Sequence, residues 1–252
     1  MISRDKLTLH LHEFLECANF NDYAPNGVQV EGKEDIKRIC TAVTASSEVI
    51  EHAIAMQADA LIVHHGYFWR GEEPVLTGMK RQRIAKLLTQ NISLLAYHLP
   101  LDCHPDIGNN ACLAKLLDIK TPKMHWAGKT PNLIWSGVIK DSKTPNEFLL
   151  QLEDVLGRRP LLVEGSNKPV QSIAWCSGAA QDFIEDAYKL GVDTYISGEI
   201  SERTYYQAKE LGIHYFSCGH HATERYGIQA LGSYLASHFK LDHHFIDSAN
   251  PV

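Results

Sequence analysis

The sequence predicts an α/β fold made of two similar α/β domains, and three observations support this prediction. Short apolar runs rich in β-branched residues alternate with amphipathic stretches, as in layered α/β proteins. A set of residues in the first half recurs at one constant spacing in the second half. The chain has 252 residues, 44% of them hydrophobic, which is enough to bury one large core or two small cores. We therefore expect domains at residues 1–125 and 126–252, with the final helix packing back on the first domain.

The expected strands are short apolar runs. They are Ile36–Val43, Asp59–His64, Ile92–Tyr97, Asn132–Ile139, Gln171–Cys176, Asp193–Ser197 and Ile213–Cys218. The expected helices are longer amphipathic stretches. They include Ser3–Cys17, Ser47–Met56, Arg83–Thr89, Ala111–Leu117, Pro145–Leu156, Asp182–Leu190, Tyr205–Leu211 and Glu224–Phe239. A turn is expected at Pro25-Asn26-Gly27.

The internal repeat can be followed residue by residue. One spacing relates the matched residues Ile39, Ile50, Glu51, Ala53, Asp59 and Ile62 to Ile173, Ile184, Glu185, Ala187, Asp193 and Ile196. Later matches, such as Ile92 with Ile213 and Gly108 with Gly227, occur at a shorter spacing. The first half therefore carries a surplus of residues, which we place in the segment 67–83. Chance similarity between two strand–helix–strand units is the alternative interpretation.

Charge and composition narrow the classes of function. The net charge is −6, with 24 Lys+Arg against 30 Asp+Glu, so a nucleic acid partner is not favoured. No segment approaches the roughly 20 apolar residues that span a bilayer, and no signal peptide is evident at the amino terminus. The six cysteines form no Cys-x-x-Cys pair, which is typical of reduced thiols. We expect a cytoplasmic protein without a membrane partner.

Two adjacent histidines follow an expected strand in Ile62-Val63-His64-His65-Gly66. Successive side chains of an extended segment point to opposite faces. The two imidazoles therefore suit two different metal ions, or one ion and one supporting role, better than chelation of a single ion. A chance pair in a loop is the alternative, because the chain also contains His220-His221 and His243-His244.

A second strand end leads into a loop that contains proline and presents His98 and Asp102. A carboxylate can ligate one metal ion or bridge two, and a nearby imidazole can ligate the ion or orient the carboxylate. Alternatively, Asp102 is a helix N-cap and His98 is a buried, hydrogen-bonded histidine at the end of a strand.

The third element contains His220 and Glu224, four residues apart, a spacing that puts two side chains on one face of a helix. In the alternative interpretation, Thr223 is the N-cap and Glu224 only complements the helix dipole. We prefer metal ligation, because the repeat would place this loop near the loop that contains Asp102.

These three elements supply a mixed set of imidazoles and carboxylates. The predicted ligands are His64, His65, Asp102, His220 and Glu224. Such a set suits Zn, Mn, Fe, Co or Ni better than Mg or Ca, which prefer oxygen ligands. A pair of divalent ions would generate hydroxide near neutral pH for hydrolysis. Cys103 and Cys218 are neighbours of the set in sequence, and thiols there could bind metal or oxidise.

The segment Gly66–Pro74 follows the first histidines and contains three aromatic residues, an arginine and two acids. Such residues could stack a base, grip a phosphate and supply a general base. The roles of Trp69, Arg70 and Glu73 stay open, and the candidates for proton transfer are Glu73 of this segment and His98 of the later loop. For Tyr67 and Phe68 we favour packing between domains or subunits.

Several long motifs occur in one order along nearly the whole chain. They are Asp22-Tyr23-Ala24-Pro25-Asn26-Gly27-Val28-Gln29-Val30-Glu31-Gly32, Val63-His64-His65-Gly66-Tyr67-Phe68-Trp69, His98-Leu99-Pro100-Leu101-Asp102, Gly108-Asn109-Asn110, Ser197-Gly198-Glu199 and Gly219-His220-His221-Ala222-Thr223-Glu224-Arg225. On these motifs the chain closely resembles the YbgI-like dinuclear-metal family, which is homologous to the eukaryotic NGG-interacting factor. Its members are often named GTP cyclohydrolase 1 type 2 homologues. Cys103 departs from the family pattern, in which a smaller residue is expected.

The resemblance implies two similar α/β domains with a two-metal site in the cleft between them. It implies the same five ligands, with Glu224 as the bridge, and a ring-shaped homohexamer. The family name implies hydrolytic opening of the guanine imidazole ring. Our first hypothesis is a metal-dependent hydrolase whose small-molecule substrate is a nucleotide or related heterocycle. The alternative is a non-enzymatic metal-binding regulatory or scaffold protein, and a ring threaded by DNA is least favoured because the chain is acidic.

Overall fold

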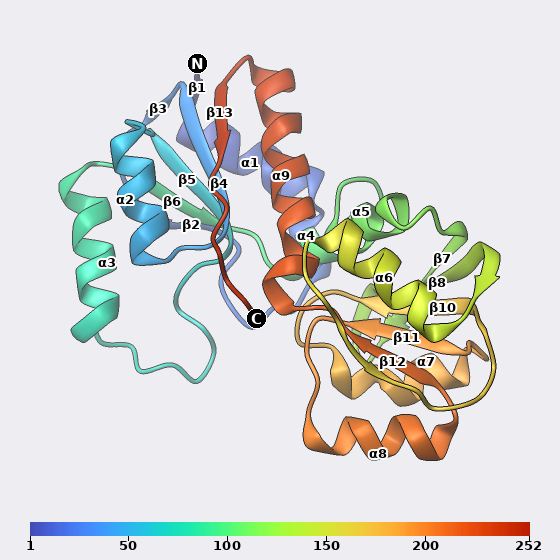
Figure 1. Cartoon of the computed structure of the whole chain (residues 1–252). Helices are drawn as coiled ribbons and strands as arrows, with labels where there is room; N and C mark the ends of the chain where they lie inside the picture. Colours follow the sequence, from blue (N-terminus) through green and yellow to red (C-terminus); the bar gives the residue numbers. More distant parts are fainter. The chain divides into compact units, whose positions relative to one another are not determined.

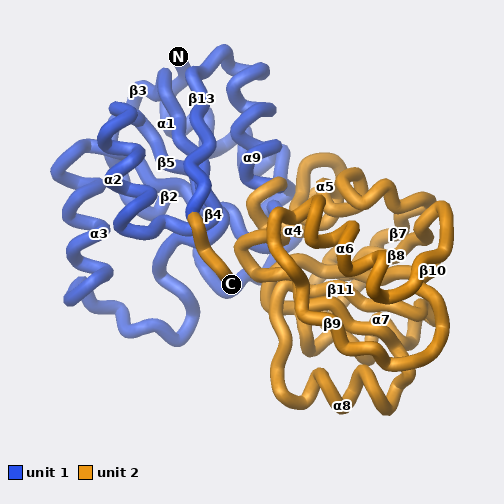
Figure 2. Tube along the Cα trace, in the orientation of Figure 1, with its two compact units in different colours: residues 1–101, 227–248 blue, residues 102–226, 249–252 orange.

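The computed structural model describes residues 1–252 and confirms the predicted α/β fold (Figure 1). The chain forms two compact units (Figure 2). Unit 1 contains Met1–Leu101 and Gly227–Ser248, and unit 2 contains Asp102–Tyr226 and Ala249–Val252. These units divide the chain after Leu101 and again inside the last helix, whereas the sequence analysis divided it between residues 125 and 126. No helix has the length and apolar character needed to cross a membrane.

Unit 1 is built on a five-stranded sheet with the order β13-β4-β5-β6-β2. Its strands are β2 (Gly27–Val30), β4 (Arg38–Thr44), β5 (Ala60–His65), β6 (Ser93–Ala96) and β13 (Asp242–Phe245). All neighbouring strands are parallel except β2, which pairs antiparallel with β6. A small antiparallel pair adds β1 (Ile2–Ser3) and β3 (Asp35–Ile36). The helices are α1 (Arg4–Phe14), η1 (Cys17–Asn19), α2 (Ser47–Ala55), α3 (Gly78–Thr89) and most of α9 (His220–Phe239).

Unit 2 is built on a six-stranded sheet with the order β7-β8-β10-β11-β12-β9. Its strands are β7 (Lys120–Ala127), β8 (Thr130–Lys143), β9 (Leu161–Val163), β10 (Val170–Cys176), β11 (Thr194–Ser197) and β12 (His214–Ser217). Only β10, β11 and β12 pair in parallel. The helices are α5 (Asn109–Leu116), α6 (Pro145–Leu156), η2 (Gln181–Phe183), α7 (Ile184–Lys189) and α8 (Glu202–Leu211). The short helix α4 (Leu99–Asp102) ends at the first residue of this unit.

The central strands of the unit 1 sheet, β4, β5 and β6, are apolar and buried. Every residue from Ile39 to Val43 in β4 is buried, so both faces of this strand are covered, as is usual for parallel strands. Residues of α2 and α3 pack with β5 in one core cluster that includes Val49, Ile84 and Leu61. The aromatic rings of Phe14 in α1 and Tyr234 in α9 stack with their centroids 4.2 Å apart.

The two units repeat a β-α-β-α-β pattern with three parallel strands, which confirms the predicted pair of similar α/β domains. The hydrogen bonds of one aspartate are also repeated between the two units. Asp59 accepts hydrogen bonds from the backbone N–H groups of Lys37 and Arg38, both at 2.9 Å. Its counterpart Asp193 accepts backbone hydrogen bonds at 2.8 to 3.2 Å from residues at the same relative positions. These donors are Gln171 and Ser172. The surplus predicted in the first half corresponds to the long loop between β5 and α3.

Helix α9 begins earlier than predicted, at His220 instead of Glu224. Gly219 precedes it with a positive φ of 95°, which lets the chain turn directly from β12 into the helix. Strands β7, β9 and β13 were not predicted, because they are short or polar.

Candidate metal centre

Three imidazoles gather in unit 1 where β5 and β6 end. His64 and His65 are the last residues of β5, and His98 follows β6 closely. The ring centroid of His64 lies 4.6 Å from that of His65 and 5.1 Å from that of His98. One nitrogen of each ring lies within 4.8 Å of the others, so the three histidines could hold a metal ion. The topology explains this cluster, because adjacent parallel strands end at the same edge of a sheet.

Neighbouring oxygens orient the two imidazoles of β5. The Nδ1 atom of His64, which is fully buried, lies 2.9 Å from the carbonyl oxygen of Tyr97. A carbonyl only accepts, so Nδ1 carries the proton and Nε2 is the nitrogen with the lone pair that binds metals. The Nδ1 atom of His65 lies 3.3 Å from the hydroxyl oxygen of Thr44.

A carboxylate orients His98. The Nδ1 atom of His98 lies 2.7 Å from Oδ1 of Asp22. Oδ2 of Asp22 accepts hydrogen bonds from the backbone N–H of Leu99 and the side chain of Asn26, both at 2.9 Å. Burial by itself raises the pKa of Asp22, but the His98 ring, the Asn26 side chain and the backbone N–H of Tyr23 outweigh it and hold the pKa below its ordinary value. Asp22 therefore stays ionised beside His98, in agreement with a hydrogen-bonded histidine at the end of a strand.

The loop after β5 brings Trp69 to the imidazoles. The Trp69 ring centroid lies 5.0 Å from that of His98 and 5.9 Å from that of His65. Glu73 is exposed, and its backbone carbonyl accepts a hydrogen bond from Lys80. Of the two candidates for proton transfer, His98 belongs to the imidazole cluster and Glu73 does not.

The two aromatic residues before Trp69 differ in their surroundings. Tyr67 is buried in the core of unit 1, where its hydroxyl donates to the carbonyl of Ala45 at 2.7 Å. Phe68 is 38% exposed, with the Lys80 ammonium 4.8 Å from its ring centroid. Tyr67 therefore packs inside the core of unit 1, which differs from the predicted packing between domains or subunits, whereas Phe68 lies at the surface of the chain.

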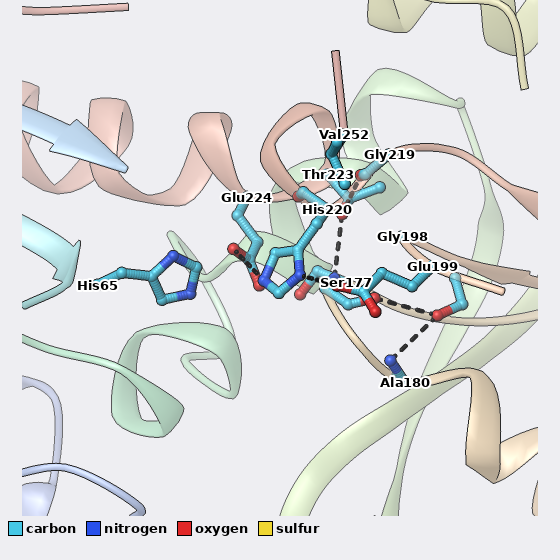
Figure 3. Close-up of polar contacts among 12 residues, drawn as sticks. His65, Ser177, Ala180, Gly198, Glu199, Gly219, His220, Thr223, Glu224 and Val252 are labelled. Atoms are coloured by element: carbon cyan, nitrogen blue, oxygen red, sulfur yellow. Dashed lines mark hydrogen bonds and ion pairs between the residues drawn. The ribbon is translucent and has the colours of Figure 1, made fainter. Parts of the chain in front are cut away.

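In unit 2, His220 and Glu224 lie on one face of the first turns of α9 (Figure 3). The Nε2 atom of His220 is 3.1 Å from Oε2 of Glu224, and the Glu224 side chain is 3% exposed. Thr223 lies inside the helix, where its hydroxyl donates to the Gly219 carbonyl and accepts from the backbone N–H of Gly178. The alternative in which Thr223 is the N-cap of this helix is therefore wrong.

The imidazole of His220 lies between two carboxylates (Figure 3). Its Nδ1 atom is 2.6 Å from Oε1 of Glu199, and Glu224 is on the Nε2 side. Burial by itself lowers the pKa of His220, but Glu224 and Glu199 outweigh it and raise the pKa to about 9. A metal ion on the Nε2 side would replace one proton, while Glu199 would still hold Nδ1–H.

Asp102 is buried in unit 2 and is oriented by two donors. Its Oδ1 atom accepts hydrogen bonds from the side chains of Asn109 at 2.8 Å and Ser177 at 3.0 Å. Asp102 is the last residue of α4, and Gly108 is the N-cap of α5, so Asp102 caps neither helix. The supporting side chains hold one oxygen of the carboxylate, which is the arrangement expected around a metal ligand.

Gly178 leaves room for Glu224. A Cβ atom at position 178 would lie 2.2 Å from Oε1 of Glu224, and the φ of Gly178 is +67°. Only glycine meets both requirements without strain. The Gly178 backbone therefore forms one wall around the Glu224 carboxylate.

The cysteines next to the predicted ligands are buried. Cys103 is 2% exposed and Cys218 is 0% exposed, and burial raises the pKa of the Cys218 thiol above its ordinary value. The histidine cluster of unit 1 contains no cysteine. The donors present are imidazole nitrogens and carboxylate oxygens, which fit a divalent transition-metal ion without thiolate.

Similarity to known proteins decides the family. The chain matches the Duf34/NIF3 (NGG1p interacting factor 3) family over residues 2–251. The chain belongs to the Duf34/NIF3 family. The resemblance inferred from the sequence motifs is thereby confirmed.

Relatives of this Duf34/NIF3 protein match it over nearly their full lengths. A GTP cyclohydrolase 1 type 2 homolog from Pseudomonas aeruginosa is 46% identical over 251 residues, which cover 100% of this chain and 99% of the relative. A protein of the same name from Pasteurella multocida is 49% identical over 244 residues, covering 96% of each chain. The solved structure of protein ybgI, of unknown function, has a TM-score of 0.95 at 46% identity and full coverage of both chains. A structure from Thermus thermophilus has a TM-score of 0.89 at 29% identity, also with full coverage.

Proposed function

We propose that this Duf34/NIF3 protein is a metal-dependent hydrolase that acts on a nucleotide or related heterocycle. One observation carries the proposal: the predicted ligands are held in place by neighbouring groups of the chain. The Tyr97 carbonyl orients His64, Glu199 orients His220, and two donors orient Asp102. Such support is typical of metal centres, in which neighbouring groups orient the ligating side chains.

We assign two divalent ions to each chain, drawn from Zn, Mn, Fe, Co or Ni. The proposed ligands are His64, His65, Asp102, His220 and Glu224. In this proposal His64, His65 and His220 would supply imidazole nitrogens, and Asp102 and Glu224 would supply carboxylate oxygens. A bound pair of divalent ions would supply the activation of a water molecule and the polarisation of the bond under attack.

His98 is the residue that we propose moves a proton. Its Nδ1–H is held by Asp22, so its Nε2 atom can accept a proton and later return it. The Asp22 carboxylate stabilises the imidazolium that forms, as carboxylates do in other imidazole pairs. Trp69 offers an aromatic face beside this imidazole, on which a heterocyclic ring could stack. The name GTP cyclohydrolase 1 type 2 homolog of the relatives supports a nucleotide as substrate.

Elemental analysis of the purified chain tests the metal assignment. We expect two ions per chain in the parent and, in Glu224→Ala, an affinity lowered by roughly 100-fold or more, because even supporting residues contribute 10- to 100-fold. His52→Ala is the matched control, since His52 is an exposed histidine of α2. Equal metal content in the two variants would show that Glu224 is not a metal ligand.

A substrate screen with the metal so found tests the hydrolase. We expect turnover of GTP or another nucleotide by the parent and His52→Ala, and loss of turnover in His98→Ala with its metal content retained. A metal-loaded parent that leaves GTP and a broad panel of nucleotides and esters unchanged would contradict the proposal. The regulatory or scaffold alternative, to which the words NGG1p interacting factor point, would then be favoured. Light scattering would test the proposed homohexamer.

A further inference from the structure

Asn110 is a polar residue that is fully buried in unit 2, and it is not one of the proposed metal ligands. It is the second residue of α5, directly after Asn109, which bonds the Asp102 carboxylate. Asparagine is mostly an exposed residue, and a buried amide needs partners for both its oxygen and its NH₂ group. The partners of Asn110 therefore indicate what this residue holds in place.

The side chain of Asn110 joins three separate segments of unit 2. Its NH₂ group donates to the carbonyl of Leu133 in β8 at 3.1 Å and contacts the carbonyl of Asp102 at 3.5 Å. Its oxygen accepts a hydrogen bond from the backbone N–H of Ser177 at 3.0 Å. One amide therefore ties the end of α4 and strand β8 to the loop that follows β10.

The backbone of Asn110 adds a further bond to β10. Its carbonyl oxygen accepts a hydrogen bond from the indole N–H of Trp175 at 3.0 Å, and the Trp175 side chain is fully buried. Trp175 is two residues before Ser177 in the sequence. Asn110 thus holds the end of β10 and the following loop at two points, which restricts the position of Ser177 more than one hydrogen bond would.

The loop that Asn110 holds lies against both proposed carboxylate ligands. The Ser177 hydroxyl donates to Oδ1 of Asp102 at 3.0 Å. Gly178 comes next in the chain, and a Cβ atom at that position would lie 2.2 Å from Oε1 of Glu224. Two adjacent residues of one loop therefore orient the Asp102 carboxylate and limit the space of the Glu224 carboxylate.

These two carboxylates lie close together in unit 2. One oxygen of Asp102 and one oxygen of Glu224 are within 4.8 Å of each other, and the two residues are 5% and 3% exposed. Buried carboxylates at this separation repel each other when both are ionised, and a cation beside them offsets the repulsion. The surrounding chain has to hold them in place against this repulsion before a cation binds.

We propose that Asn110 is a positioning residue of the metal centre. By fixing the backbone of Ser177, it keeps the Asp102 and Glu224 carboxylates in the arrangement that binds a divalent ion. Asn110 acts through this loop and not as a ligand. The inference rests on the proposed metal-dependent function and adds a residue to its metal centre.

Titration of the metal-free chain with Zn²⁺ tests the role of Asn110. We expect Asn110→Ala to lower the Zn²⁺ affinity by about 10- to 100-fold, the usual effect of losing a group that supports metal ligands. Ser172→Ala is the matched control, because it removes a hydroxyl that exchanges hydrogen bonds with Asp193 at the opposite end of β10. This control should bind Zn²⁺ as the parent does. Parent-like affinity in Asn110→Ala would overturn the inference and leave the metal centre intact.

A double-mutant cycle tests whether Asn110 acts through Ser177. Ser177→Ala removes the hydroxyl that bonds Asp102, so we expect it to lower the Zn²⁺ affinity by about tenfold or more. Because both changes disturb the same loop, the double variant should lose less affinity than the product of the two single losses. Single losses that multiply in full would show that Asn110 does not act through Ser177 and would refute the inference.

Cobalt spectroscopy separates positioning of the ligands from a general loss of stability. The visible absorption bands of bound Co²⁺ change with the number and geometry of its ligands. At saturating Co²⁺, we expect Ser172→Ala to reproduce the spectrum of the parent and Asn110→Ala to show shifted bands. A parent-like spectrum of Asn110→Ala would contradict a positioning role, because a protein that is only less stable keeps its ligand geometry once it is folded and saturated.

Hydrogen exchange in the metal-free chain provides a test that needs no metal. The backbone N–H of Ser177 should exchange slowly in the parent and in Ser172→Ala, and faster by about tenfold or more in Asn110→Ala, because the amide oxygen that accepts this hydrogen is lost. Equal exchange rates at Ser177 in all three proteins would refute the inference. A parent that shows the expected exchange but binds no Zn²⁺ would instead overturn the metal centre, and the role of Asn110 in it.

Discussion

The two units share a parallel three-stranded core but carry different polar residues at the ends of their strands. In unit 1, β5 ends in His64 and His65. At the corresponding positions after β11, unit 2 has Gly198 and Glu199. The imidazole of unit 2 comes instead from His220 on α9, and Glu199 orients it. The repeated scaffold thus places strand ends at equivalent positions in the two units. The residues at those ends are proposed metal ligands in unit 1, whereas Glu199 in unit 2 orients a proposed ligand.

The units also differ in how their predicted ligands are oriented. In unit 1, a backbone carbonyl holds His64, and one side-chain hydroxyl, that of Thr44, lies 3.3 Å from Nδ1 of His65. In unit 2, side chains hold the ligands: Glu199 bonds His220, and Ser177 bonds Asp102. A carbonyl is present whatever the side chain, whereas a carboxylate or hydroxyl is lost by one substitution. Metal binding through unit 2 should therefore be more sensitive to substitution of supporting residues.

The largest effect is expected from Gly178→Ala. The new Cβ atom would lie 2.2 Å from Oε1 of Glu224, so the carboxylate must move and metal affinity should fall by roughly 100-fold or more. Gly191→Ala is the matched control, because its φ is also positive, +76°, and nothing lies within 4 Å of the new atom. It should cost only about 1 kcal/mol of stability and keep the metal. Elemental analysis and urea unfolding of both variants would measure their metal content and stability. Retention of metal by Gly178→Ala would contradict the requirement for glycine beside the Glu224 carboxylate.

Glu199→Gln should lower metal affinity by roughly 10- to 100-fold, the usual effect of losing a group that supports a ligand. The amide can still accept a hydrogen bond from Nδ1 of His220 but carries no charge. Glu210→Gln, at the exposed end of α8, is the control and should bind metal as the parent does. Titration with Zn²⁺ measures both variants. Equal affinities would show that Glu199 does not support the ligand.

Asp59→Ala and Asp193→Ala compare the repeated carboxylates, and each should lower the free energy of unfolding by about 1 to 3 kcal/mol because backbone N–H groups lose a charged acceptor. Burial alone raises the pKa of Asp59, but the Lys33 ammonium and two backbone N–H groups hold it below its ordinary value. The stabilisation by Asp59 is therefore complete above its unfolded pKa of about 3.9 and is lost as pH falls through the lower folded value.

Urea unfolding of the parent and the Asp59→Ala variant at several pH values checks the direction of this pH dependence. The difference in their free energies should stay constant from neutral pH to about pH 5 and shrink below it. A difference that grows on acidification would contradict the assignment. A free energy of unfolding that is unchanged in Asp193→Ala would show that the repeated aspartate does not stabilise both units.

The smallest effect is expected at helix N-termini. In unit 2, Thr144 and Glu147 form a capping box at the start of α6. Thr144→Ala should therefore cost about 1 kcal/mol of stability. In unit 1, Thr77 precedes α3 without a side-chain cap hydrogen bond, so Thr77→Ala should cost a few tenths of a kcal/mol at most. Urea unfolding would measure both, and equal costs would contradict this distinction.

Elements that bury apolar residues were predictable from the sequence. Helix α6 begins and ends at the predicted residues, Pro145 and Leu156, because a proline, a capping box and an apolar stripe mark it. Strand β7 was not predicted because it is mostly exposed and polar, and its conformation depends on pairing with β8. Strand β13 contains a histidine pair, and its pairing with β4 joins residues far apart in the chain.

The candidate ligands were predicted from their local positions, such as a strand end for His64 or a helical spacing for His220 and Glu224. Their supporting residues were not predicted, because each acts across a long separation in sequence. Asp22 lies 76 residues from His98, and Ser177 lies 75 residues from Asp102. The motifs that contain Asp22 and Glu199 were conspicuous in the sequence, but nothing local showed which histidine each one contacts.

Tyr97 separates two roles within one residue. Its carbonyl orients a proposed metal ligand, and every amino acid supplies a carbonyl. Its phenol hydroxyl, in contrast, is specific to tyrosine. Natural selection can therefore discard the hydroxyl without disturbing the tautomer of His64. A relative with phenylalanine at this position would keep the carbonyl that orients His64 and would lose only the phenol oxygen.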